Sequence, residues 1–178
     1  MATIDADQCP IDGEAVLLGS ATLEGEKSFM QQAIAEAEEG VLSGGGPFGA
    51  VVVKDGEVVA FAHNEVVPSL DPTAHAEVNA IRKACKKLKT FSLEGCVLYT
   101  SCYPCMMCHA AIHWARIGRV FYGNSALDAQ GIGFDDVAIW DDLLKPSEGR
   151  LVQYSSLCAE EAKVTFQKWE ENLAFERY

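Results

Sequence analysis

The chain alternates segments of helical and of strand character, and this alternation restricts its fold more than any other feature. Helical segments carry apolar residues three and four positions apart, whereas strand segments are short β-rich runs. From the N-terminus, the order is helix, strand, strand, helix, strand, helix, strand, strand and helix, at residues 28–41, 48–53, 57–62, 73–89, 96–99, 104–116, 119–122, 151–154 and 160–175. Such alternation predicts an α/β fold built in layers, with helices covering both faces of a sheet.

The boundaries of these segments carry recognisable signals. Ser28 is a plausible N-cap for the first helix, and the run Ser43-Gly44-Gly45-Gly46 ends it. Lys54-Asp55-Gly56 joins the first two strands as a hairpin. Pro104 stands where a helix begins, because proline is tolerated in the first turn.

Length and charge restrict the organisation of the chain and its partners. A chain of 178 residues fits one domain, and we expect residues 1–25 to form an N-terminal extension and 26–178 the domain. No apolar run reaches the length of a membrane span, and acidic residues near the N-terminus replace the positive start of a secretory signal, so we expect a cytoplasmic protein without a membrane partner. The formal charge of −12 disfavours a nucleic-acid partner, and we interpret the basic cluster over residues 82–89 as a solvated helix face.

The cysteines indicate metal or redox chemistry. There are seven, an odd number in a chain without an export signal, so a disulfide framework is not expected. Three of them, Cys102, Cys105 and Cys108, lie within seven residues.

Two segments together predict a zinc site. His75 stands at the start of one expected helix, and Cys105 and Cys108 stand at the start of another. Residues three apart on a helix share a face, so both thiolates can reach one ion. One histidine and two thiolates leave a fourth tetrahedral position open, which is typical of catalytic zinc.

Glu77 adds a proton carrier to this site. It follows His75 by two residues, and a carboxylate beside zinc but not bound to it can shuttle protons. A histidine, a nearby glutamate and a downstream Pro-Cys-x-x-Cys form the signature of zinc-dependent nucleobase deaminases.

Other interpretations of the cysteines explain less of the sequence. Cys102 and Cys105 also form a Cys-x-x-Cys pair, but Pro104 places Cys102 before the helix rather than on its face. A redox pair, or a haem attached at Cys105, Cys108 and His109, would leave His75 and Glu77 unexplained.

The chain resembles the cytidine deaminase superfamily and, within it, the bacterial type of guanine deaminase. The resemblance runs from about residue 26 to residue 178 and rests on His75-Ala76-Glu77 and Pro104 to Cys108, which mark the superfamily. Three further features point to guanine, namely Gly45-Gly46-Pro47-Phe48-Gly49-Ala50, Gly133-Phe134-Asp135-Asp136 and a terminal Tyr178. Tyr103 and Met106 depart from the family, which usually has glutamate and proline there.

The resemblance implies a three-layer α/β/α sandwich around a central five-stranded mixed sheet. It also implies one Zn²⁺ per subunit, held by the metal ligands named above, with Glu77 and Asp136 as catalytic residues. The implied substrate-binding residues are Asn64, Phe48, Ala76, Trp114 and Tyr178. The family is dimeric, and its C-terminal segment can be exchanged between subunits.

The function implied by the resemblance is zinc-dependent hydrolysis of guanine to xanthine and ammonia. Guanosine deamination is the nearest alternative, because it uses the same chemistry on the nucleoside. A tRNA adenosine deaminase shares the metal motif but conflicts with the net charge of −12. A non-catalytic zinc-stabilised domain would have no use for Glu77.

Overall fold

A four-stranded mixed sheet forms the centre of the molecule. The structure, a computed structural model, describes residues 23–172. The strands are β1 (Gly49–Lys54), β2 (Glu57–His63), β3 (Cys96–Cys102) and β4 (Arg119–Asn124), and they lie in the order β2-β1-β3-β4. β1 runs antiparallel to both β2 and β3, whereas β3 and β4 are parallel.

The β1–β2 hairpin is fixed by its two-residue turn. Lys54 pairs with Glu57, so that only Asp55 and Gly56 lie between the strands. Both turn residues have positive φ, 51° and 80°. Asp-Gly is favoured at such a turn, whose twist matches that of the flanking strands. The predicted hairpin is therefore confirmed.

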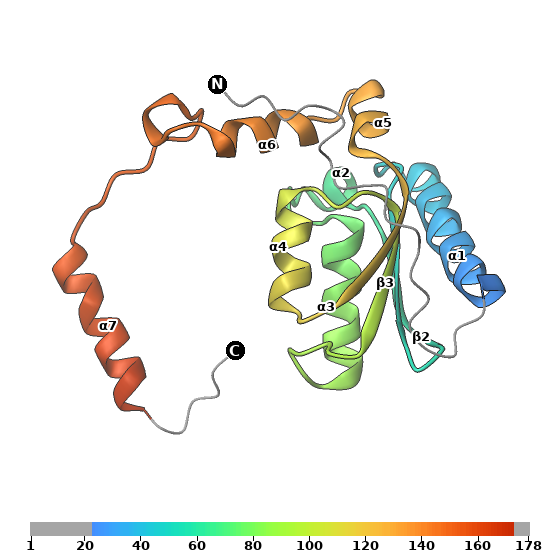
Figure 1. Cartoon of the computed structure of the whole chain (residues 1–178), viewed down its shortest axis with the longest axis horizontal. Helices are drawn as coiled ribbons and strands as arrows, with labels where there is room; N and C mark the ends of the chain where they lie inside the picture. The colour runs from blue at the N-terminus through green and yellow to red at the C-terminus, as the bar shows by residue number, and fades with distance from the viewer. Residues whose placement is uncertain (1–22, 173–178) are drawn as a thin grey trace.

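Helices cover both faces of the sheet, as the alternation predicts (Figure 1). The helix α1 (Leu23–Leu42) packs on the face formed by Val51, Val53 and Tyr99. The opposite face carries α3 (Ala76–Leu88) and α4 (Met106–Trp114). Because successive strand residues point to opposite faces, β1 is buried on both sides.

Gly49 permits the close approach of α1 to β1. A Cβ atom at this position would lie 2.1 Å from the carbonyl oxygen of Ala33 and 2.4 Å from the backbone nitrogen of Ala37. The backbone N–H of Gly49 donates a hydrogen bond to Ser101 Oγ at 3.0 Å. The segment Gly45-Gly46-Pro47-Phe48-Gly49-Ala50, called the glycine-rich segment below, is thus fixed against both α1 and β3 where it enters the sheet.

The predicted five-stranded sheet is wrong for the described part of the chain. Residues 151–154, expected as a further strand, are exposed and form no strand, and the N–H of Leu151 donates instead to the Asp142 carboxylate at 3.0 Å. A β-rich run becomes a strand only where it finds a partner. β4 is accordingly an edge strand.

The structure also adds helices that the sequence did not predict. Two of them, α5 (Ala126–Gly131) and α6 (Asp136–Leu144), lie between β4 and the C-terminal region, and the short α2 (Val66–Ser69) follows β2. A single 3-10 turn covers Ser147–Gly149.

The predicted start of the first helix is wrong. α1 is already helical at Leu23, so Ser28 lies inside the helix and is not its N-cap. The last helix, α7 (Ala159–Glu171), is close to the predicted one and stands apart from the layers at the end of an irregular segment (Figure 1). None of the helices described here has the length and apolar character needed to cross a membrane.

Candidate active site

Two helix starts on the same face of the sheet bring the predicted metal ligands together. His75 is the N-cap of α3 and Cys105 is the N-cap of α4, each with extended backbone angles. Cys108 lies one turn into α4 and is fully buried. The positive ends of two helix dipoles therefore converge on one point, where they stabilise thiolates.

The three side chains fit a zinc ion. Their ligand atoms all lie within 4.8 Å of one another, and His75 Nδ1 is 3.6 Å from Cys105 Sγ and 3.5 Å from Cys108 Sγ. Hydrogen bonds from Cys108 and from His75 lower the pKa of Cys105 to about 4. Cys105 is thus a thiolate at neutral pH, and the proton that Cys108 retains is the one a cation displaces on binding.

Glu77 lies beside this cluster in a buried position. It occupies the first turn of α3, and its Oε2 accepts a hydrogen bond from Cys108 Sγ at 3.3 Å. The hydroxyl of Thr100, on β3, donates to Oε1 at 3.1 Å. Burial raises the pKa of Glu77 above its usual value. A raised pKa makes the carboxylate a stronger base, which suits it to accept a proton.

A cavity of about 420 Å³ opens above the cluster. This volume is within the range of small-molecule sites. The cavity is lined by the glycine-rich segment, the end of β2, the two helix starts and the α5–α6 connection, with these residues: Gly45, Gly46, Pro47, Phe48, Asn64, Val66, Val67, His75, Glu77, Cys102, Tyr103, Cys105, Phe134 and Asp136.

Asn64 presents an amide donor to this cavity. Its Oδ1 accepts hydrogen bonds from the backbone N–H groups of Gly46 at 3.3 Å and Val66 at 3.2 Å. With the carbonyl oxygen engaged, the group that Asn64 can offer to a ligand is its NH₂. Gly45 allows the close approach of these two segments, because a Cβ there would lie 2.0 Å from the backbone carbonyl oxygen of Asn64.

The far wall of the cavity joins an aromatic pair to a carboxyl group. The rings of Phe48 and Phe134 meet edge to face, with centroids 4.7 Å apart. Asp136 begins α6, and burial raises the pKa of its carboxyl group. The wall therefore combines apolar faces for a flat ring with one hydrogen-bonding carboxyl group.

Two predicted substrate contacts do not line this cavity, and a third lies outside the described residues. Trp114, at the end of α4, is 61% exposed and does not line the cavity. Ala76 is fully buried in the core cluster between α3 and the sheet. Tyr178 lies outside the described residues.

Other functional contacts were missed from the sequence. Thr100 gives no signal of its own, because a threonine in a buried strand usually packs there. Phe134 lies within a motif that was noticed, but only its contact with Phe48 assigns it to the cavity wall. Cys102 lines the cavity with its Sγ hydrogen-bonded to the Ser125 carbonyl at 3.5 Å, and burial raises its pKa to about 12.

Comparison with a protein family supports the assignment of a metal site. Residues 23–124 match the family described as "Cytidine and deoxycytidylate deaminase zinc-binding region". The match contains every metal-ligating candidate and Glu77, and it ends with β4.

Individual relatives are similar over most of the chain. The guanine deaminase of Bacillus subtilis is 50% identical over 144 residues, 80% of this chain and 92% of the relative. A tRNA-specific adenosine deaminase of Aquifex aeolicus is 41% identical over 138 residues, covering 78% and 89%.

Solved structures give the same picture. The crystal structure of guanine deaminase from Bacillus subtilis superposes with a TM-score of 0.82 at 48% identity, covering 85% of this chain and 98% of that one. A guanine deaminase structure from Nitrosomonas europaea gives a TM-score of 0.61 at 31% identity and covers 66% of each chain.

Proposed function

Because this chain belongs to the cytidine and deoxycytidylate deaminase family and shares its α/β fold, we propose that it is a zinc-dependent guanine deaminase. The reaction adds water to guanine and releases ammonia, leaving xanthine. The observation that carries the proposal is the cluster of His75, Cys105 and Cys108 beside a buried Glu77, at the floor of a cavity walled by Phe48 and Phe134. The similarity to guanine deaminases over nearly their whole length supports the choice of base.

The metal ligands would be His75, Cys105 and Cys108, with one zinc ion per subunit. When bound, zinc supplies Lewis-acid activation of a water molecule for attack on a ring carbon. The Cys105 thiolate places negative charge at this point, and metal binding would displace the proton of Cys108, so a divalent cation is favoured over a neutral ligand.

Glu77 would move the protons. It takes one from the attacking water and delivers it to ring nitrogen N3 as C2 is attacked, and it then assists protonation of the amine that leaves C2. The hydroxyl of Thr100 holds one carboxylate oxygen at 3.1 Å, so the other oxygen is aimed toward the metal ligands. The side chain is thus oriented before substrate arrives.

Asn64 and Asp136 would recognise the edges of the base, and Asp136, the second catalytic residue, would hold the leaving amino group or assist its protonation. The NH₂ group of Asn64 suits an acceptor atom of guanine, whereas the carboxylate of Asp136 suits the amino group that is lost. Phe48 and Phe134 supply apolar contact for the ring faces. Trp114 and Tyr178 remain proposed contacts, and Trp114, which is exposed in the single chain, would require a segment arranged differently.

RNA is disfavoured as a partner despite the similarity to tRNA deaminases. The net charge is −12, and a protein that binds a phosphate backbone needs exposed cations in a patch. Two of the clustered cations on α3 serve the fold instead, since Lys83 Nζ donates to the Phe61 carbonyl at 3.3 Å and Lys87 Nζ to the Val58 carbonyl at 3.5 Å.

The test of function is ammonia release from guanine, guanosine, adenine and cytosine by zinc-loaded and zinc-depleted protein. Zinc-dependent release from guanine alone is the expected result. Release from guanosine instead would preserve the proposed metal ligands and Glu77 but overturn the choice of substrate. Absence of release from all four by zinc-loaded protein would contradict the proposed activity.

We further propose that the enzyme is a homodimer in which the C-terminal segment packs on the partner subunit. Ala162, Phe166 and Trp169 share one face of α7, and Phe166 is 74% exposed. An isolated helix of 13 residues is marginally stable in water, so this face needs a surface to cover it.

The domain division between residues 25 and 26 and the cytoplasmic location stay predictions.

The dimer is tested by sedimentation of the full chain and of Phe166→Asp. We expect a dimer for the full chain and monomers for the variant, because a buried charge opposes packing of this face.

Deletion of Tyr178 should leave the dimer intact and lower the rate of guanine deamination if the tail closes the site. An unchanged rate would remove Tyr178 from the proposed substrate contacts.

A further inference from the structure

One buried polar side chain near the cavity is not explained by substrate contact or metal binding. Asn79 lies on α3 two residues after Glu77, is 8% exposed and does not line the cavity. Asparagine is a poor helix former, because its side chain competes for backbone hydrogen bonds. A buried asparagine in a helix therefore needs partners that its position supplies.

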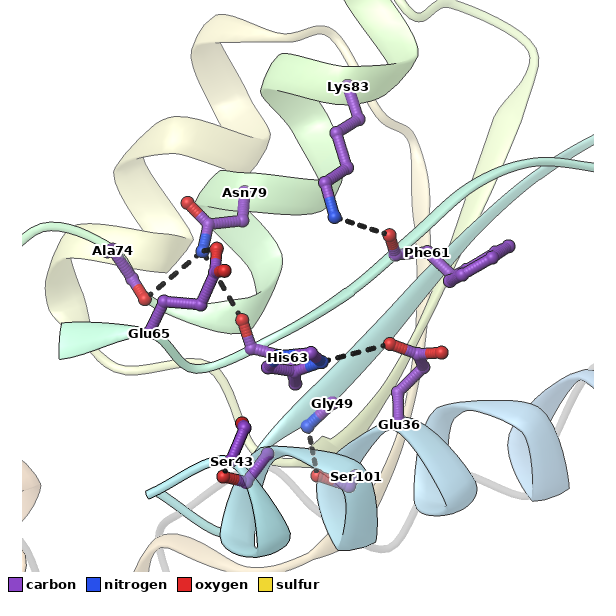
Figure 2. Close-up of polar contacts among 11 residues, drawn as sticks. Glu36, Ser43, Gly49, Phe61, His63, Glu65, Ala74, Asn79, Lys83 and Ser101 are labelled. Carbon is purple, nitrogen blue, oxygen red and sulfur yellow. Dashed lines mark hydrogen bonds and ion pairs between the residues drawn. The ribbon is translucent and has the colours of Figure 1, made fainter. Parts of the chain in front are cut away.

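The partners of Asn79 lie at the end of β2 and in the segments that enter and leave α2 (Figure 2). Its Nδ2 lies 3.0 Å from Glu65 Oε2, 3.3 Å from the His63 carbonyl oxygen and 3.3 Å from the Ala74 carbonyl oxygen. An amide NH₂ has two hydrogens, so three acceptors converge on a group with two donors.

These acceptors stand directly beside two residues of the proposed site. His63 precedes Asn64 and Glu65 follows it, whereas Ala74 precedes His75. The Glu65 N–H also donates to the Ala74 carbonyl at 2.9 Å, so the two segments are bonded to each other as well as to Asn79.

The placement of Asn64 depends on this arrangement. Its Oδ1 is held by backbone N–H groups, one of which belongs to Val66 in the same segment. The direction of its NH₂ therefore follows the backbone that Asn79 fixes. Glu77 and Asn79 are rigidly related by the helix that carries both.

We propose that Asn79 is a positioning residue that sets the base-binding Asn64 and the metal ligand His75 relative to Glu77. Asn79 then links α3, which carries Glu77, to the two segments that carry the base-binding Asn64 and the metal ligand His75. The part of this inference that concerns the base rests on the proposed function, whereas the part that concerns His75 rests on the geometry of the metal ligands alone.

The test compares zinc-loaded full-length wild type with Asn79→Leu, which keeps the size of the side chain and removes the donors. We expect KM for guanine to rise about tenfold with kcat reduced less than threefold, since loss of a base contact weakens binding more than chemistry. We also expect zinc to be lost to a competing chelator at about tenfold lower chelator concentration, because the support of a ligand is removed. The chelator measurement does not depend on activity.

Two further variants make the result specific. Asn79→Thr keeps one hydroxyl donor and should recover part of both losses. Lys83→Met is the matched control, because Lys83 also joins α3 to a carbonyl of β2, at Phe61, which is three residues before Asn64 rather than next to it (Figure 2). It should leave KM and zinc retention unchanged. If Asn79→Leu does not fold, Asn79→Thr against wild type carries the same comparison.

Two results would overturn the inference. One is an Asn79 variant with lowered thermal stability but unchanged KM and zinc retention, which would make the residue merely structural. The other is equal effects of Lys83→Met and Asn79→Leu, which would reflect general loosening of α3 from the sheet. If wild type fails to deaminate guanine, the proposed function fails, and chelator competition still decides whether Asn79 supports His75.

Discussion

Among single residues, His75 and Cys105 owe their chemistry to equivalent backbone positions. Each is the N-cap of a helix and has extended backbone angles. In most helices, this position is taken by a side chain that bonds the free N–H groups. Neither residue makes such a side-chain bond here, so both side chains are available to a metal.

The proposed proton transfer by Glu77 can be tested by replacing one oxygen of its carboxyl group. Replacement by glutamine keeps the size and the hydrogen-bond acceptor for Thr100 but removes the site that takes up a proton. We expect zinc content to stay at one per chain and kcat to fall by about 10²- to 10⁴-fold, the usual contribution of general acid–base catalysis. Metal analysis and steady-state kinetics on the same preparation check this, and near-normal turnover in zinc-loaded Glu77→Gln would contradict proton transfer by Glu77.

The sequence predicted the metal-ligating and proton-transferring residues of the site better than the residues that surround them. His75, Glu77, Cys105 and Cys108 were identifiable because their spacing is local and each residue type has a defined ligand chemistry. Phe134 and Thr100 act through contacts with residues far apart in sequence, at Phe48 and Glu77, and no local spacing encodes such contacts.

At the scale of elements, predictions succeeded where the local signal was strong. The Asp55-Gly56 turn fixed the β1–β2 hairpin because few residue pairs accept two positive φ angles. The predicted start of α1 was wrong because tertiary contacts outweigh a possible cap at Ser28. Glu26 is buried and accepts a hydrogen bond from the Tyr99 hydroxyl, and this contact stabilises the helical turn before Ser28.

The element α5 was missed although its signal is present in the sequence. Ser125 and Asp128 form a capping box, in which the Ser125 hydroxyl accepts from the Asp128 N–H and the Asp128 carboxylate accepts from the Ser125 N–H. This Ser-x-x-Asp pattern resembles the known helix-start signature, in which glutamate is the usual fourth residue. The strand predicted at 151–154 failed for the opposite reason, since its residues are suited to a strand but no described strand pairs with them.

The capping box predicts that the loss of stability caused by Ser125→Ala depends on pH. Removing an N-cap hydroxyl destabilises a protein by about 1 kcal/mol. Hydrogen bonds from the Ser125 hydroxyl and then its backbone N–H lower the pKa of Asp128. A lowered folded-state pKa stabilises the protein above the unfolded value of about 3.9, and this contribution is lost as pH falls through the folded value.

The difference in stability between wild type and Ser125→Ala should therefore be larger at about pH 6 than at about pH 3. Urea unfolding at both pH values measures it. Ser156→Ala, in an exposed serine outside the helices, is the control and should show no such dependence. A constant difference across the two pH values would contradict the role of the Asp128 carboxylate.

At the scale of the whole molecule, zinc joins elements that are distant in sequence. His75 starts α3 and the two thiolates start α4, and these helices cover the same face of the sheet. A ligand that binds only the folded state stabilises it according to its concentration relative to Kd. The metal should therefore contribute to stability as well as to catalysis.

Removal of zinc should lower the thermal midpoint of the whole protein. Free zinc at a thousand times its Kd adds about 4 kcal/mol of stability, which corresponds to a decrease of roughly 8–16 °C for a chain of this size. Scanning calorimetry with and without a chelator measures the shift. The variant Cys105→Ser should show a much smaller one, and a shift equal to that of wild type would place the stabilising ion elsewhere.

The cavity wall has a consequence for how this catalyst can diverge. Residues 23–124 contain the proposed metal ligands and Glu77, whereas Phe134 and Asp136 come from the α5–α6 segment that follows. Substitutions in that short segment can alter which ring is accepted while the inherited reaction is kept. A mutant library restricted to residues 125–144 is therefore a direct route to variants that accept other amine-bearing heterocycles.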